Sequence, residues 1–137
     1  MNIKKFYEDT NSNYQGALSI MMNDSLIERM IKKFMESNSY HAIIEAYEAN
    51  NIKEVFALSH SFKGVTGNLS LTNLFKLASE LTEATRNKES ADIKDLIEQL
   101  KAEYKVVVDA FNALNNWIQN FVVLKKIIEF CRVFHLK

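Results

Sequence analysis

The chain has 137 residues, which is enough for one hydrophobic core and a single domain. Hydrophobic residues make up 47% and charged residues 25%, which argues against a disordered chain, and 17 basic residues balance 17 acidic ones, so no net field attracts nucleic acid or an anionic membrane. Proline is absent and glycine occurs three times, so the turns of a β-protein lack their usual residues and helices are favoured.

Apolar residues recur at helical spacing along most of the chain. They predict helices at about 3–9, 14–22, 25–37, 39–49, 51–69, 74–86 and 90–114. Polar residues at Ser25, Ser39, Asn51 and Ser90 are predicted to cap four of these helices. Because the loops between them are short, neighbouring helices are expected to run antiparallel, as in an up-and-down all-α bundle.

Residues 113–137 form a very apolar segment after the last of these helices. Four charges, at Lys125, Lys126, Glu129 and Arg132, make a membrane span unlikely in this segment. We expect residues 1–112 to form the bundle and residues 113–137 to form a helical C-terminal extension, either a separate helix or a continuation of the last one, folded against the bundle. The alternative is a dimerisation or partner-docking helix, so the expected state is a monomer, with a dimer through this segment as the second option.

Cys131 is the single cysteine, so no intrachain disulfide is expected and a reducing compartment is favoured. No secretory leader is recognisable at the N-terminus, and the sequence predicts a cytoplasmic protein. His41, Cys131 and His135 form no cluster at metal-ligand spacing, and no phosphate-binding loop motif occurs. The sequence therefore predicts neither a metal nor a cofactor.

The segment from residue 51 to residue 69 predicts a helix with a histidine on its outer side. Its expected core stripe is Val55, Leu58, Phe62, Val65 and Leu69. His60 lies two residues from Leu58 and two from Phe62, which is roughly 200° around the helix at about 100° per residue. The spacing therefore predicts that His60 faces away from the core.

Phe56, Lys63, Gly64 and Gly67 lie one or two turns from His60 and share its face. Each glycine inside a helix costs about 1 kcal/mol relative to alanine, so two of them one turn apart need a reason. The pattern favours clearance for another protein that approaches the histidine ring. An outward-facing Phe56 favours a docking patch for that protein.

The chemistry of this face suits group transfer. An exposed imidazole is a nucleophile near neutral pH and can carry a covalent intermediate. Lys63 can give a charge-assisted hydrogen bond to a phosphoryl group on His60. A surface histidine beside a lysine is, however, often simply solvated, so the geometry alone leaves both interpretations open.

The run HSFKGVTGN at residues 60–68 resembles the His-x-apolar-Lys-Gly motif of histidine-containing phosphotransfer (HPt) domains. The resemblance covers roughly residues 6–112 and implies an antiparallel four-helix bundle with accessory N-terminal helices. It implies that His60 is phosphorylated, that Lys63 is its charge partner and that Gly64 gives a receiver domain access.

The resemblance also implies two positions on the following helix. Many family members carry a glutamine near the histidine, and Thr82 stands at the corresponding spacing with a shorter hydroxyl side chain. Arg86, one turn later, matches a basic position seen in some members. Lys63, Thr82 and Arg86 are therefore the implied phosphoryl-stabilising residues, with Phe56, Gly64 and Gly67 serving receiver access and docking.

These inferences predict a phosphorelay intermediate of two-component signal transduction. It would carry a phosphoryl group on His60 between receiver-domain aspartates or from a histidine kinase, without kinase activity of its own. Its partners would be a response-regulator receiver domain and a histidine kinase, and the partner would supply Mg²⁺ and the aspartate. The alternative is a helical adaptor or oligomerisation domain of the same fold without phosphotransfer. A small enzyme that uses His60 as acid or base is a weaker interpretation, because no second catalytic group converges on it.

Overall fold

The computed structural model describes the backbone of residues 2–135 and the side chains of residues 2–114, together with those of Ile127 and Ile128. The described residues form helices and no strand. The helices are α1 (Ile3–Asp9), α2 (Tyr14–Met21), α3 (Asp24–Glu36), α4 (Ser39–Glu48), α5 (Ile52–Asn68), α6 (Thr72–Thr85) and α7 (Lys94–His135). The predicted all-α fold is confirmed. None of these helices combines the length and the apolar character needed to cross a membrane.

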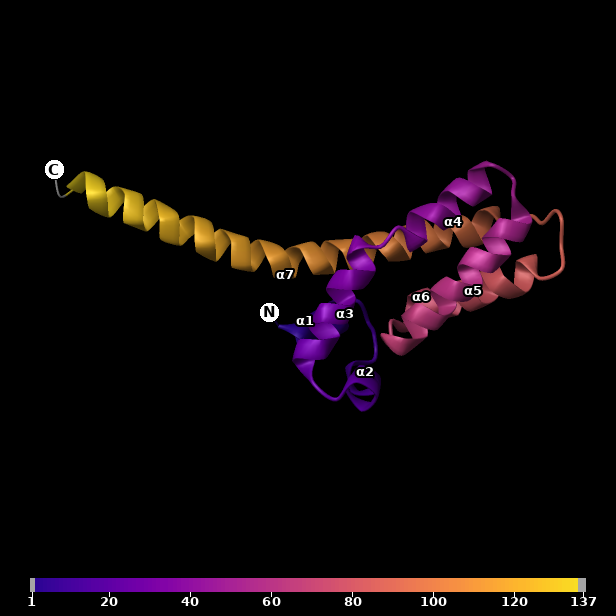
Figure 1. Ribbon diagram of the computed structural model, residues 1–137, viewed down its shortest axis with the longest axis horizontal. Helices are drawn as coiled ribbons and strands as arrows, with labels where there is room; N and C mark the ends of the chain where they lie inside the picture. Colours follow the sequence, from indigo (N-terminus) through magenta and orange to yellow (C-terminus); the bar gives the residue numbers. More distant parts are fainter. Residues whose placement is uncertain (1, 136–137) are drawn as a thin grey trace.

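Helices α4, α5, α6 and the first part of α7 run side by side and form the bundle (Figure 1). Short turns join α4 to α5 and α5 to α6, so these neighbours run antiparallel. Tyr40 of α4 stacks on Tyr104 of α7 with 3.7 Å between the ring centroids, which closes the bundle. The N-terminal helices cover one end, where the Tyr7 hydroxyl of α1 donates a 2.6 Å hydrogen bond to the carbonyl oxygen of Leu69.

Helix α7 is longer than the bundle and continues well past it (Figure 1). Leu114 is the last residue of α7 in the described core. The predicted C-terminal extension is thus, in its backbone, a continuation of α7 and not a separate helix. Ile127 and Ile128 are exposed, whereas the other side chains of residues 115–137, including Cys131, lie outside the described residues, so the predicted packing of this segment stays a prediction.

Asparagines cap several helices, which corrects part of the sequence prediction. Asn51 caps α5 as predicted, since its Oδ1 accepts a hydrogen bond from the backbone N–H of Glu54 at 3.2 Å. Asn23, and not Ser25, caps α3, because its Oδ1 accepts from the Leu26 N–H at 2.8 Å. The prediction for Ser90 was wrong, since α7 begins four residues later, at Lys94. An asparagine carbonyl is as good an N-cap acceptor as a serine hydroxyl, so either residue type fits such a site.

The buried face of α5 differs from the predicted stripe. Ser59 and Thr66 are fully buried, whereas Val65 is 41% exposed and Leu58 only partly covered. Both hydroxyls donate to carbonyl oxygens of their own helix, Ser59 to Phe56 at 3.2 Å and Thr66 to Phe62 at 2.9 Å. Burial is tolerated because these polar groups are satisfied locally. The small Ser59 side chain lies directly against Thr82 of α6, whose hydroxyl donates to Ser59 Oγ at 3.2 Å.

Candidate functional site

The outer side of α5 presents five residues in sequence order, which we call the histidine face: Phe56, His60, Lys63, Gly64 and Gly67. The His60 side chain is exposed, as its spacing predicted. Its ring stacks on Phe56, one turn earlier, with 6.1 Å between the centroids and 21° between the planes. Phe56 is partly buried, so it supports one side of the imidazole and leaves the rest of the ring open to solvent.

Lys63 lies one turn after His60 and is only partly exposed. Its Nζ sits 6.0 Å from the ring centroid of Phe75, a residue of α6. This contact holds the aliphatic stem against an aromatic surface and keeps the ammonium group beside the histidine face. The placement agrees with the predicted role of Lys63 as a charge partner, a role that no contact here tests.

The two glycines of the histidine face have different surroundings. A Cβ atom added to Gly64 would meet no atom within 4 Å, so this position is open. A Cβ added to Gly67 would lie 3.1 Å from both Cδ2 and Cε2 of Phe75. The structure therefore gives Gly67 a packing role, because it leaves room for the Phe75 ring. Gly64 alone retains the open surface that the clearance prediction requires.

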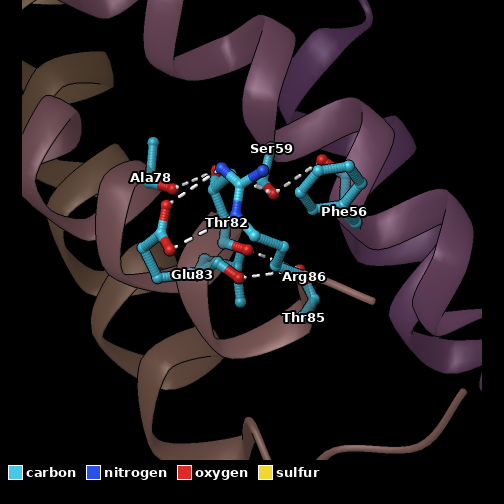
Figure 2. A network of polar contacts seen from close by, with 8 residues as sticks. Phe56, Ser59, Ala78, Thr82, Glu83, Thr85 and Arg86 are labelled. Atoms are coloured by element: carbon cyan, nitrogen blue, oxygen red, sulfur yellow. Dashed lines mark hydrogen bonds and ion pairs between the residues drawn. The ribbon is translucent and has the colours of Figure 1, made fainter. Parts of the chain in front are cut away.

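Arg86, at the end of α6, reaches across to the histidine face. Its guanidinium carbon lies 5.2 Å from the ring centroid of Phe56, on which His60 also stacks. Arg86 Nη2 donates to Glu83 Oε1 at 3.0 Å and Arg86 Nε donates to Glu83 Oε2 at 3.3 Å, a two-point ion pair. Figure 2 shows the guanidinium group between Glu83 and Phe56. The structure thus brings Arg86 next to the ring that supports the histidine.

The carboxylate of Glu83 lies in the field of two cations. The hydrogen bond from Arg86 and the charge of Arg86 lower the pKa of the Glu83 carboxyl, and the charge of Lys63 lowers it further. Lys63 belongs to α5 and lies on the histidine face, whereas Glu83 belongs to α6 and Arg86 is the C-cap residue of α6. The seam between the two helices therefore carries two positive charges and one negative charge, contributed by Lys63, Arg86 and Glu83.

Thr82 does not lie on the histidine face. It is fully buried, and its hydroxyl donates to the Ala78 carbonyl at 2.7 Å and to Ser59 Oγ at 3.2 Å (Figure 2). Because both contacts lie inside the α5–α6 seam, the structure does not bring this hydroxyl to the exposed ring of His60. The structure therefore lends the implied phosphoryl contact of Thr82 no support.

Glu83 and Phe75 belong to this site but were not among the predicted site residues. Glu83 has a signal in the sequence, because its spacing of three residues before Arg86 is typical of a helical ion pair. Phe75 had no such local signal, because its partner Gly67 lies on another helix. Among the described residues, no three His, Cys, Asp or Glu side chains gather at a metal-binding distance.

His60 is exposed and lines none of three hollows found in the described part of the protein. A hollow of about 700 Å³ is lined by residues of α1, α3 and α7, among them Ile3, Asp9 and Leu114, and so lies away from the histidine. Small-substrate sites are usually concave. The surroundings of His60 therefore suit contact with another protein better than capture of a small molecule.

The family model of the Hpt domain matches residues 25–110, which is more than half of the chain. The protein belongs to the Hpt domain family. The match spans α3 to α6 and the part of α7 that lies in the bundle, and so includes the whole histidine face. At the level of the family, this means phosphotransfer in two-component signalling by a carrier, with receiver domains and histidine kinases as partners. Neither the curated proteins nor the solved structures contain a match to this chain.

Proposed function

We propose that this protein is a phosphorelay intermediate that carries a phosphoryl group on His60, between receiver-domain aspartates or from a histidine kinase to a receiver. The observation that carries the proposal is the exposure of His60 on the helix of the matched domain, with open space at Gly64. A buried or hydrogen-bonded core histidine could not meet an acceptor on another protein.

The transfer is a displacement at phosphorus. The lone pair of one His60 ring nitrogen attacks the phosphorus of an aspartyl phosphate, the N–P bond forms, and the bond from phosphorus to the aspartate oxygen breaks. The aspartate leaves as a carboxylate, and the proton on the other ring nitrogen can pass to solvent. The reverse displacement returns the group to a second receiver. The partner supplies the carboxylate and the divalent metal, so this chain contributes the nucleophile, its orientation and positive charge.

The residues of the histidine face and of the adjoining helix α6 have different roles in this proposal. Phe56 stacks on the imidazole and limits its rotation, which orients the attacking nitrogen. Lys63 and Arg86 supply charge for the phosphoryl oxygens, which an ammonium or guanidinium group binds well. Gly64 leaves the surface low enough for a receiver domain to approach. Thr82 acts from inside, by holding α6 against Ser59 of α5.

The test is phosphorylation followed by intact mass. The wild-type chain, His60→Gln and the matched control His41→Gln are each incubated with a phosphorylated receiver domain and with phosphoimidazole. His41 is also exposed, so its replacement removes a surface imidazole from α4 without touching the histidine face. We expect one acid-labile phosphoryl group on the wild type and on His41→Gln, and none on His60→Gln. An adduct that persists in His60→Gln, or no adduct on the wild type with either donor, overturns the proposal.

A helical adaptor of the same fold is the second candidate, favoured by the continuation of α7 well beyond Leu114. An adaptor would use the helical surface for binding and would not need a reactive imidazole. Binding of a receiver domain to wild type and to His60→Gln, compared by calorimetry, separates the two. Unchanged affinity together with no phosphoryl transfer in the wild type would favour the adaptor.

A further inference from the structure

Two contacts between a cation and an aromatic ring cross the α5–α6 seam in opposite directions. Lys63 of α5 lies over Phe75 of α6, and Arg86 of α6 lies over Phe56 of α5. Along α5, Phe56 comes one turn before His60 and Lys63 one turn after it. The two cation–aromatic contacts therefore involve residues of α5 that lie one turn before and one turn after His60.

Glu83 is the anion that accompanies these two cations. Its carboxylate accepts both hydrogen bonds from Arg86, and the charge of Lys63 acts on it as well. A two-point contact to a guanidinium group is also how a phosphoryl group is bound, because both anions present two oxygens to the same planar fork. Glu83 therefore occupies two donors of Arg86 that are suited to binding a phosphoryl group.

We propose that Glu83 is a positioning residue that competes with the phosphoryl group for Arg86, so that Arg86 changes partner from the carboxylate to the phosphoryl oxygens when His60 is loaded. This inference rests on the proposed phosphotransfer function and adds to it a residue that weakens the loaded state. The phosphoryl group carries more negative charge than a carboxylate, which favours the exchange. The Glu83–Arg86 ion pair must be broken first, which lowers the free energy that Arg86 contributes to the phosphorylated state.

The competition has a consequence for the relay. A group stabilises the phosphorylated state only by the difference between its interactions in the phosphorylated and the unphosphorylated protein. In the unphosphorylated protein Arg86 already binds the carboxylate of Glu83, so this difference is small. The carrier therefore binds its phosphoryl group less tightly than a free arginine would allow. Such a carrier can both accept a phosphoryl group from one receiver and release it to another.

A double-mutant cycle tests the role of Glu83. Wild type, Glu83→Gln, Arg86→Gln and the double variant are equilibrated with phosphoimidazole and imidazole, and the ratio of phosphorylated to free chain is read by intact mass. We expect Glu83→Gln to raise the ratio about two- to five-fold, the range for one exposed ion pair. In the Arg86→Gln background the same replacement should change the ratio by much less.

Glu80→Gln is the matched control, because Glu80 is also exposed on α6 and its replacement removes the same charge one turn away. We expect it to leave the ratio close to that of wild type. An equal increase in Glu80→Gln and Glu83→Gln, or an effect of Glu83→Gln that persists in Arg86→Gln, would show general repulsion and overturn the competition. Circular dichroism checks that all variants are folded.

The two proposals fail in different ways. If phosphoimidazole and a phosphorylated receiver both leave the wild type unmodified, the carrier function falls and the competition falls with it. If the wild type is phosphorylated on His60 but Glu83→Gln has the same ratio, the carrier function stands and the competition alone is wrong. The Arg86 Nε–H resonance gives an independent readout, since it should shift when the wild type is treated with phosphoimidazole and should not shift in His60→Gln.

Discussion

The inner and outer sides of helix α5 use polar residues in opposite ways. On the inner side, Ser59 and Thr66 are fully buried and donate to carbonyl oxygens of their own helix. No buried side-chain nitrogen or oxygen among the described residues lacks a hydrogen-bond partner. On the outer side, His60 faces solvent and only its ring face is supported, by Phe56. One helix thus combines a fully satisfied interior with an exposed nucleophile, so substitutions on the two sides should affect different properties.

Phe62→Ala on the inner side should have the largest effect. Phe62 is fully buried and contacts Phe34 of α3 with 5.6 Å between the ring centroids. Its truncation leaves a cavity and should lower the free energy of unfolding by about 3–5 kcal/mol, measured by urea denaturation. The phosphorylated fraction of the folded protein should not change. A loss of phosphorylation in fully folded Phe62→Ala would break the separation between the two sides.

Thr82→Val tests the seam below the histidine. The replacement removes the hydroxyl that donates to Ala78 and to Ser59, and it should lower the free energy of unfolding by about 0.5–1.5 kcal/mol. The equilibrium with phosphoimidazole should remain that of wild type, because the hydroxyl lies inside the seam. If Thr82→Val instead weakened phosphorylation without loss of stability, the hydroxyl would reach the phosphoryl group after all.

Gly64→Ala on the outer side should have the smallest effect on stability, and of opposite sign. Its added Cβ meets nothing within 4 Å, so the gain in helix propensity should stabilise the protein by about 0.5–1 kcal/mol. Phosphoryl transfer from a phosphorylated receiver domain should become slower, whereas the reaction with phosphoimidazole should keep its wild-type rate. Both rates are measured by intact mass on samples in which the reaction is stopped at set times.

Gly67→Ala is the control for Gly64→Ala, because its Cβ would approach Phe75 to 3.1 Å. It should gain less stability than Gly64→Ala or lose some. Equal receiver transfer in Gly64→Ala and wild type would contradict the access role of Gly64.

Sequence periodicity predicted the helices and the exposure of His60, because the helical repeat is strong and the chain offers few breaking residues. It misplaced the centre of the buried face of α5. Val65 is apolar but exposed, and Thr66 is polar but buried, since a hydroxyl that bonds its own helix costs little inside. A hydrophobicity pattern does not reveal whether a hydroxyl is hydrogen-bonded to its own helix.

The site was predictable where its parts are close in sequence. His60, Lys63 and Gly64 follow one another on a single helix, so their shared face could be read from spacing. The relation of Arg86 to Phe56, of Phe75 to Gly67 and of Thr82 to Ser59 depends on how α6 lies against α5. A single sequence does not give the packing of α6 against α5, so it did not predict that Thr82 is buried between these two helices.

The close packing of Phe75 against Gly67 also affects the position of Arg86, which lies at the other end of the α5–α6 pair. The α5–α6 pair has one contact between Phe75 and Gly67 and another between Arg86 and Phe56, and these two contacts lie about three helical turns apart. Together they fix the alignment of α5 and α6. A slip of one residue would rotate α6 by about 100° and move Arg86 away from the Phe56 ring. The packing of Phe75 against Gly67 thereby fixes the rotation of α6 about its own axis, and with it the direction in which Arg86 points.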